Sequence, residues 1–438
     1  RADDHLLPVP RGARPRLVAA LLARATPAAG AARFAAPQGF TTGECLTPST
    51  ACTMQVMVAT LLPGETGFVL DGLYRGSAGM INPLIGKRGT PLAPLTIVGL
   101  TDGGATVDGQ FVRDAVRFNG GNAWWRIVGL NLKHCLTLCL YLTGTPGNDD
   151  NVFQRLVVWD GLQGCIGMHR GVRTLLEDVA AFGVCGRKSI SATQSGGAWT
   201  CRRSYGNWGW YARTVGGSLP LSVVYNNLDV VVEYSIVSKN GFDIPHTYDN
   251  DWNGNGVLDV MTGHEEPSVN VLLGVDRNDC HVDPAAPCPP KEANSIVRKS
   301  LVLQTATDRW IGFVGGGYPS NLPARMWFHG LSNLTLSDLV VAVASAHPRF
   351  DEGWGLALTR TPQNGPTMGV NTADPVVGNS ATRITTLIGT QGNTIHADWA
   401  PGVSGVSRGD CAIGSTAAPC GGARTTPVQT PWQNTSTI

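Results

Sequence analysis

Two short pieces of sequence decide the fold of this chain: LPGETGFVLDGLYRG at residues 62–76 and GTPLAPLTIVGLTDGGATVDG at residues 89–109. In both, short apolar strands such as 68–70 and 95–98 alternate with turns that contain glycine, proline or aspartate. No helical period separates the strands, so we predict that they stack on one another rather than pair as hairpins.

The same unit, a β-branched strand followed by a Gly, Asn or Asp turn, recurs along the rest of the chain. Four successive units fall at Gly129, Arg155, Glu177 and Arg203, so the numbering advances by 26, by 22 and again by 26. A spacing in the twenties fits one turn of a solenoid, in which each coil buries its apolar face on the next. From Glu233 to Lys299 the numbering advances by 66, so we predict a long loop excursion at about 241–293.

The opening pieces resemble the first coils of pectate-lyase-like right-handed parallel β-helices, nearest to secreted alginate and chondroitin lyases. In those proteins a "PGD…G.Y" turn leads to "GT…PITI…G…IDG". The resemblance covers the stretch 62–109 and implies an all-β, single-stranded right-handed parallel β-helix. We expect this solenoid at 41–400, an N-terminal arm or cap at 1–40, and a looped tail at 401–438.

Composition narrows the class of protein. The charged fraction is 15% and the formal net charge is +1, so the chain has no broad field for capturing nucleic acid. It contains no run of about 20 apolar residues, and we therefore predict no transmembrane segment. Glycine, at 55 of 438 residues, accompanies a 42% hydrophobic content, which fits turns between many buried strands rather than disorder.

The eleven cysteines indicate an oxidising compartment, so we expect a secreted or cell-surface protein. Three pairs are close in sequence and predict loop disulfides: Cys45/Cys52, Cys280/Cys288 and Cys411/Cys420. The spacing of Cys139, Cys165 and Cys185 follows the coils, and favours a ladder of small apolar side chains over the alternative, an inter-coil disulfide. Sequence alone leaves the connectivity of five cysteines open: Cys135, Cys139, Cys165, Cys185 and Cys201.

The excursion contains a candidate calcium loop that reads D-x-N-x-N-G-x-x-D from Asp251 to Asp259. Alternating oxygen side chains can surround one hard cation, and the glycine permits the sharp turn between them. The loop resembles the calcium loops of thrombospondin type 3 and dockerin-like repeats. The candidate ligands are Asp249, Asp251, Asn253, Asn255 and Asp259. The alternative is an Asx-rich turn without metal.

Candidate catalytic residues are Lys239, Asp243 and His246, which follow a predicted strand and precede the calcium-type loop. A polyuronide lyase needs a base and a cation that neutralises the substrate carboxylate. No catalytic motif of the resembled family occurs here, so no residue role is carried over from it. The alternative is that Lys239 belongs to a solvated turn with Asn240 and Gly241.

Two functions follow from these observations. The first is a secreted β-helix protein that binds or acts on polysaccharide, as a calcium-assisted polyuronide lyase. The second is a non-catalytic structural or adhesive subunit of an extracellular surface assembly, whose partners are other protein subunits. Because a β-helix exposes strand edges at its ends, we also expect the N-terminal arm to cap the first coil or to dock on another subunit.

Overall fold

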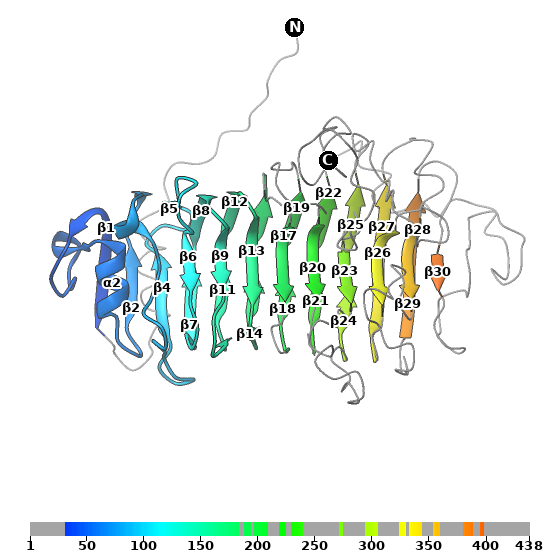
Figure 1. The fold of residues 1–438 in the computed structure, drawn as a ribbon, viewed down its shortest axis with the longest axis horizontal. Coiled ribbons are helices and arrows are strands. Elements are labelled where there is room, and N and C mark those ends of the chain that lie inside the picture. The colour runs from blue at the N-terminus through cyan, green and yellow to red at the C-terminus, as the bar shows by residue number, and fades with distance from the viewer. Residues whose placement is uncertain are drawn as a thin grey trace, which may run out of the picture.

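The computed structural model describes residues 31–183, 185, 188–193, 197–208, 219–224, 229–239, 271–274, 294–304, 324–329, 333–343, 354–359, 380–388 and 395–397. Every strand pairing among them is parallel, and successive coils stand side by side along the long axis of the molecule (Figure 1). The predicted right-handed parallel β-helix is confirmed.

Two sheets form the coil walls. Sheet A contains β1 (Ala32–Phe40), β2 (Thr66–Val69), β3 (Gly72–Tyr74), β4 (Leu95–Gly99), β5 (Ala105–Asp108), β7 (Trp125–Val128), β8 (Leu130–Cys135), β11 (Val152–Gln154), β12 (Val157–Gly161), β15 (Leu175–Glu177), β16 (Ala180–Phe182), β18 (Thr200–Arg202), β19 (Tyr205–Trp208), β21 (Val231–Glu233), β22 (Ile236–Lys239), β24 (Ile296–Arg298), β25 (Leu301–Gln304), β27 (Thr335–Val343) and β29 (Ser380–Ile388). Sheet B contains β6 (Val116–Phe118), β9 (Leu138–Leu142), β13 (Gly164–His169), β17 (Lys188–Thr193), β20 (Leu219–Val224), β23 (Val271–Gly274), β26 (Ala324–His329), β28 (Trp354–Thr359) and β30 (Ile395–Ala397). The remaining elements are the strand pair β10 (Asn148–Asp149) and β14 (Gly171–Val172), the helix α2 (Met54–Thr60), and two 3₁₀ turns, η1 (Pro48–Thr50) and η2 (Ser77–Gly79).

From β7 onward, successive coils of sheet A bend at a residue with a left-handed backbone. These bend residues have φ between 47° and 71° and are Gly129, Arg155, Asp178, Arg203, Tyr234, Lys299 and Asp338. Side-chain-bearing residues rarely adopt this conformation, so its recurrence at one position of successive coils marks a built corner. The bend falls on Asp178 and Tyr234, immediately after the predicted Glu177 and Glu233, and the numbering of the first four bends advances by 26, by 23 and by 25.

The 66-residue interval from Glu233 to Lys299 is a single coil, because Val231 pairs directly with Ile296 in the next coil. The predicted excursion at 241–293 is therefore two segments, since β23 lies within it and pairs with β20 and β26. One segment, 240–270, connects sheet A to sheet B, and the other, 275–293, returns the chain to sheet A.

Charged side chains alternate along the bend. Glu233, with its side chain 3% exposed, accepts hydrogen bonds from Arg202 Nε at 2.6 Å and from Arg298 Nη2 at 2.5 Å, one coil away on either side. Beside this column, Arg203 donates two hydrogen bonds to Asp178, at 2.7 and 2.8 Å. The guanidinium groups face solvent while the Glu233 carboxylate lies beneath them, so opposite charges join neighbouring coils.

A buried serine ladder follows the bend. The backbone N–H of Ser204 donates to Ser235 Oγ, and that of Ser235 donates to Ser300 Oγ, each at 3.2 Å. Each hydroxyl in turn donates to a carbonyl two residues earlier in its own coil, at 2.9 Å. Every coil thus satisfies a backbone N–H of the coil before it, which leaves these buried polar groups paired.

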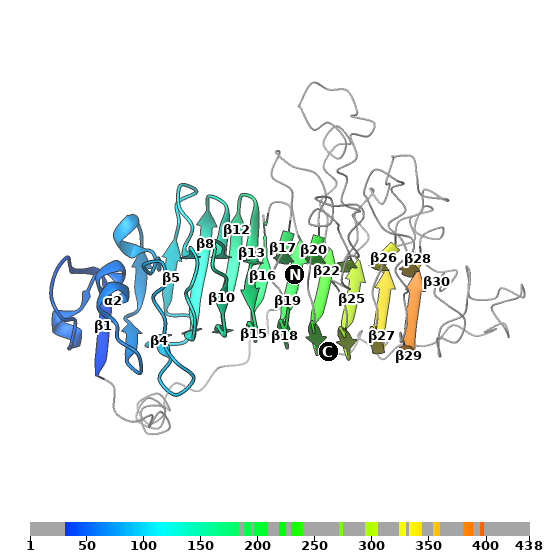
Figure 2. The same ribbon diagram turned by 60° about the horizontal axis from the view of Figure 1, so that its bottom comes forward.

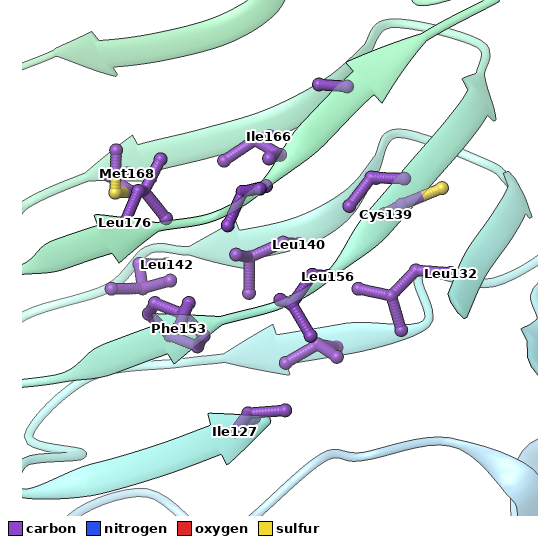
Figure 3. Close-up of a cluster of buried hydrophobic side chains, with 14 of the residues drawn as sticks. Ile127, Leu132, Cys139, Leu140, Leu142, Phe153, Leu156, Ile166, Met168 and Leu176 are labelled. Carbon is purple, nitrogen blue, oxygen red and sulfur yellow. The ribbon is translucent and has the colours of Figure 1, made fainter. Parts of the chain in front are cut away.

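The interior is a continuous apolar column. Side chains from sheets A and B, such as Leu132, Leu140 and Ile166, and from the bend, such as Leu156, are fully buried and point toward one another between the strands (Figure 3). In sheet A strands such as β4, buried and partly exposed positions alternate with the two-residue period of a strand, whereas the sheet B strands β9 and β13 are buried along most of their length. Trp125 is also fully buried, whereas its neighbour Trp124 is partly exposed, as expected for adjacent strand residues.

The disulfides correct one prediction and confirm another. Cys165 and Cys185 form an inter-coil disulfide with Cα atoms 4.9 Å apart, so the favoured ladder of unpaired thiols was wrong. This distance matches the spacing of stacked strands, which brings residues of adjacent coils within disulfide reach. The predicted pair Cys45–Cys52 is present, and Cys135 pairs with Cys139. Cys201 is buried and unpaired, and the pairs predicted at 280/288 and 411/420 lie outside the described residues.

The N-terminal end of the solenoid is closed by residues 44–60. Strand β1 lies within the segment expected to be an arm, and it pairs with β2 on one side only. On its other side, Phe34 N–H donates to Cys45 O and Phe40 N–H donates to Ala51 O. Helix α2 begins after the capping residue Thr53 and buries Met54, Met57 and Val58 over the end of the core. The first strand edge is therefore covered within the coil domain itself.

Candidate functional site

The candidate site lies where the chain leaves sheet A and enters sheet B, an edge that we call the loop corner. Strands β5, β8 and β12 end side by side along it (Figure 2). The connections at this edge range from the short 136–137 after β8 to the long 240–270 after β22. Variable connections on a rigid wall are where binding and catalytic residues concentrate in folded proteins.

An aspartate and a histidine from adjacent coils meet at the loop corner. Asp108, whose side chain is 2% exposed, accepts hydrogen bonds from Gln110 N–H at 3.0 Å and Arg75 Nε at 3.1 Å. Burial raises the pKa of this carboxyl, but these two hydrogen bonds and the neighbouring His134 outweigh it, and the net pKa is lowered. Asp108 is therefore an anion at neutral pH.

His134 is held by this anion, since its Nδ1 lies 3.2 Å from Asp108 Oδ1. A carboxylate can only accept, so this contact assigns the proton of the neutral imidazole to Nδ1 and leaves Nε2 as the basic atom. Nε2 lies 3.8 Å from Asp160 Oδ2, and the ring stacks on Phe111 with centroids 4.7 Å apart. The imidazole is 31% exposed, so an aspartate-oriented base faces solvent here.

A column of outward-facing residues runs beside this pair. Lys133 and Trp159 are partners in β8 and β12, and Phe182 follows in β16. Lys133 Nζ lies 5.8 Å from the Trp159 ring centroid, and the Trp159 and Phe182 rings are 6.1 Å apart with an interplanar angle of 4°. Their strand neighbours point into the core, so both aromatic rings and the ammonium line the outer wall.

A second polar row crosses the outer face of sheet B. The Arg117 guanidinium lies 5.1 Å from the Tyr141 ring centroid, and Tyr141 contacts His169 edge-on at 5.2 Å. Arg117 is oriented by Asp114, which accepts from Nη1 at 2.9 Å, and by Asn119, which accepts from Nε at 2.8 Å. Its side chain remains 41% exposed, so a positive charge is held in a defined direction above an aromatic ring.

The structure places Lys239 at the same edge. It ends β22 and pairs with Trp208 and Gln304 in the adjacent coils. Continuing the register from Trp208 through Gly183 and Asp160 leads to His134, so Lys239 lies in the His134 column. Four coil steps of roughly 4.8 Å put their backbones about 19 Å apart.

The other predicted site residues, Asp243, His246, Asp249, Asp251, Asn253, Asn255 and Asp259, lie outside the described residues. Both ends of their segment, 240–270, are nevertheless at the loop corner, because it connects β22 to β23. Within the described part of the chain, no three His, Cys, Asp or Glu side chains are grouped to hold a metal ion. The predicted calcium site thus stays a prediction.

Sequence reasoning missed Asp108, His134, Lys133 and Trp159. They come from three successive coils, Asp108 in β5, Lys133 and His134 in β8, and Trp159 in β12, and no local motif joins them. Only the strand register brings them together. Had the coil spacing been projected forward from Asp108, it would have pointed to Lys133 and His134.

Known proteins are only distantly similar to this chain. No protein-family model matches the chain, and no curated protein matches it. Among solved structures, it is similar to pectate lyase Pel9A, with 14% identity over 72% of this chain and 77% of that one, at a TM-score of 0.37. A rhamnogalacturonan lyase shares 13% identity over 82% of both chains, with a TM-score of 0.48. An alginate lyase from Paenibacillus sp. str. FPU-7 shares 11% identity over 74% of this chain and 93% of that one, with a TM-score of 0.36. At these identities and TM-scores the likeness carries no argument about this chain, whose fold follows from its own parallel strand pairings.

Proposed function

We propose that this chain is an exported β-helix protein that binds an acidic polysaccharide along the loop corner. The observation that carries the proposal is the outward column of Lys133, Trp159 and Phe182, which places two aromatic rings and a cation side by side on the outer wall. Sugar rings stack on exposed aromatic side chains, and ammonium and guanidinium groups pair with carboxylates. The three described disulfides fit an oxidising compartment. Among the described helices, none is long and apolar enough to cross a membrane.

The chemistry that this corner supports is proton abstraction beside a carboxylate, as in cleavage of a polyuronide by β-elimination. His134 Nε2 takes the proton from the carbon that bears the carboxylate, and the released electron pair forms a carbon–carbon double bond. The glycosidic carbon–oxygen bond on the adjacent carbon breaks, and its oxygen takes a proton from solvent. Arg75, bonded to Asp108 through Nε and 55% exposed, supplies positive charge beside the base. Lys239, with Asp243 and His246, is the alternative base set further along the same column.

The proposal includes calcium, because the candidate calcium ligands lie in the segment that starts after Lys239. The side-chain oxygens of Asp249, Asp251, Asn253, Asn255 and Asp259 form an oxygen-only donor set, which suits a hard cation. A bound calcium ion there would supply positive charge for a substrate carboxylate. Because the segment begins and ends at the loop corner, it would supply that charge beside the same edge.

Binding and cleavage need separate tests. Calorimetry with alginate, pectate and glycosaminoglycan oligosaccharides measures binding, and we expect Trp159→Ala to weaken it about 3- to 10-fold, the usual value of one aromatic stack. Arg155→Ala, on the bend outside the loop corner, is the matched control and should leave the affinity unchanged. Equal affinities for wild type and Trp159→Ala on every ligand, or no binding at all, would overturn the proposed surface.

Cleavage is measured as the ultraviolet absorbance of unsaturated uronate ends, with calcium present. We expect His134→Ala to abolish the signal while oligosaccharide binding persists. Loss with Lys239→Ala and not with His134→Ala would transfer the base to the alternative set. If no polymer gives a signal, the lyase chemistry is wrong.

The second function, a non-catalytic structural or adhesive subunit of a surface assembly, is favoured by the ion pairs along the bend. Glu233 and Asp178 join their coils to neighbours through arginine, which stiffens the solenoid without forming a site. Binding of polysaccharide or of extracellular protein subunits without cleavage would support this function.

A further inference from the structure

An exposed apolar patch lies near the N-terminal end of the solenoid, at the corner opposite the loop corner. There the chain leaves sheet B and enters sheet A. Four large aliphatic side chains on two connections, which we call the rim patch, are exposed: Leu62 by 56%, Leu84 by 72%, Ile85 by 69% and Leu92 by 96%. Single exposed leucines are ordinary, but several on adjoining connections indicate a contact surface.

The two connections adjoin each other. Gly64 N–H donates to Pro94 O at 3.0 Å, two residues from Leu62 and from Leu92 respectively. Lys87 Nζ donates to Ala59 O at 2.6 Å, which joins the Leu84–Ile85 turn to the end of helix α2, three residues before Leu62. The four side chains therefore belong to one region of the surface.

The longer connection is held rigidly, so its apolar side chains are presented to solvent rather than left loose. Gly86 N–H donates to Gly120 O and Gly89 N–H donates to Ala123 O, each at 2.9 Å. The buried side chain of Asn122 donates to Leu84 O at 2.8 Å, and the indole of buried Trp125 donates to Lys87 O at 3.0 Å. Ordering the connection that carries Leu84, Ile85 and Leu92 in this way leaves their apolar surface in water unless something covers it.

The N-terminal segment of the same chain ends at this rim. Strand β1 starts at Ala32, which pairs with Thr66, and Thr66 pairs with Thr96. The residue before β1 is therefore level with the ends of the connections that carry Leu62 and Leu92. Residues 1–30 contain one long run of apolar residues, the seven from Leu17 to Ala23, and its four large side chains all lie within 17–22.

The chain between this apolar run and β1 is long enough for the run to contact the rim patch. Eight residues separate Leu22 from residue 31, and they span up to about 27 Å when extended. The rim patch lies within two coils of β1, or about 10 Å along the solenoid. We propose that residues 17–22 of this chain cover the rim patch, forming an intramolecular apolar contact on the side of the first coils. The contact is independent of polysaccharide binding.

Photocrosslinking in the full-length chain tests this assignment. With benzoylphenylalanine in place of Leu92, we expect a crosslink to the peptide that contains residues 17–22 of the same chain. Its yield should stay constant over a tenfold dilution of the protein. Leu100, 44% exposed at the other end of β4, is the matched control position and should give no such product. A product that forms between two chains and falls on dilution would assign the patch to a second copy and overturn the proposal.

A second measurement keeps the proposal testable if crosslinking fails. The double variant Leu21→Asp with Leu22→Asp removes the apolar face of the segment without touching the described core. We expect its binding of a fluorescent apolar dye to rise at least about twofold over wild type, at unchanged circular dichroism. Unchanged dye binding would show that the patch is not covered by this segment.

Discussion

Glu233 should be the most sensitive charged residue of the solenoid. Its carboxylate is almost fully buried and accepts hydrogen bonds from Arg202 Nε at 2.6 Å, Arg298 Nε at 2.8 Å and Arg298 Nη2 at 2.5 Å. Burial raises its pKa, but the bonds from Arg298 and Arg202 outweigh burial and lower it. Glu233→Ala leaves two guanidinium groups without their shared acceptor.

The size of the effect follows from these contacts. A hydrogen bond to a charged group contributes about 1.5–3 kcal/mol, so three would give at most about 9 kcal/mol. Both arginine side chains are 40–45% exposed, and water replaces much of what they lose. Arg202 also keeps Glu177, at 3.5 Å. We therefore expect a loss of about 2–3 kcal/mol, confined to the coils that contain β18, β21 and β24.

Native-state hydrogen exchange measures this loss coil by coil. The amides of Arg203 and Tyr234 bond across the affected coils and should exchange about 30- to 160-fold faster in Glu233→Ala. Asp178→Asn is the matched control, because it alters the same ladder where the carboxylate is 41% exposed, and it should change exchange by no more than about fivefold. Equal effects of the two substitutions, or no effect of Glu233→Ala, would refute the argument that burial decides the strength of these pairs.

Three further outcomes are expected. Replacing Cys165 and Cys185 by serine should lower the free energy of unfolding by about 3 kcal/mol, the chain-entropy value for a loop of about 20 residues, as measured by denaturant titration. The free energy of unfolding should fall in acid, because the pKa values of Glu233 and Asp108 are lowered in the folded state. The stability that these two carboxylates contribute is present above about pH 4 and is lost as the pH falls through their folded-state pKa values. Urea titrations at a series of pH values from about 7 to about 3 would detect this loss. Chelation should increase proteolysis within the Asp249–Asp259 loop without loss of the β-sheet circular dichroism, and unchanged cleavage would indicate a metal-free turn.

The fold was readable from the sequence because its determinants are local. Short apolar strands such as 95–98 are recognisable in the sequence because glycine and proline bound them, and the spacing between repeated units gives the length of one coil. The left-handed bends were not predicted, because all but Gly129 are filled by residues with side chains, such as Asp178 and Tyr234, and the sequence does not mark these positions as it would with glycine.

The site was less accessible, because it depends on register. Lys239 was found from its place at a strand end, and the structure puts it in the His134 column. The pairing of His134 with Asp108 is visible only when two coils are set side by side, as is the Cys165–Cys185 disulfide. Composition and spacing report how long a coil is, but a side-chain contact depends on alignment to the single residue.

The coil between Tyr234 and Lys299 shows how a β-helix accommodates a long insertion between two of its strands. It is more than twice as long as the coil between Asp178 and Arg203, yet its strands align with both neighbours without slippage. Lengthening a connection costs only about 0.6 kcal/mol per doubling, whereas a slip of one residue in a strand would turn its core side chains outward. A foreign segment whose ends lie close together could therefore be inserted between Lys239 and Val271, where the strands β22 and β23 would anchor both of its ends. In evolutionary terms, new recognition can be tried at that junction while the scaffold beneath it stays unchanged.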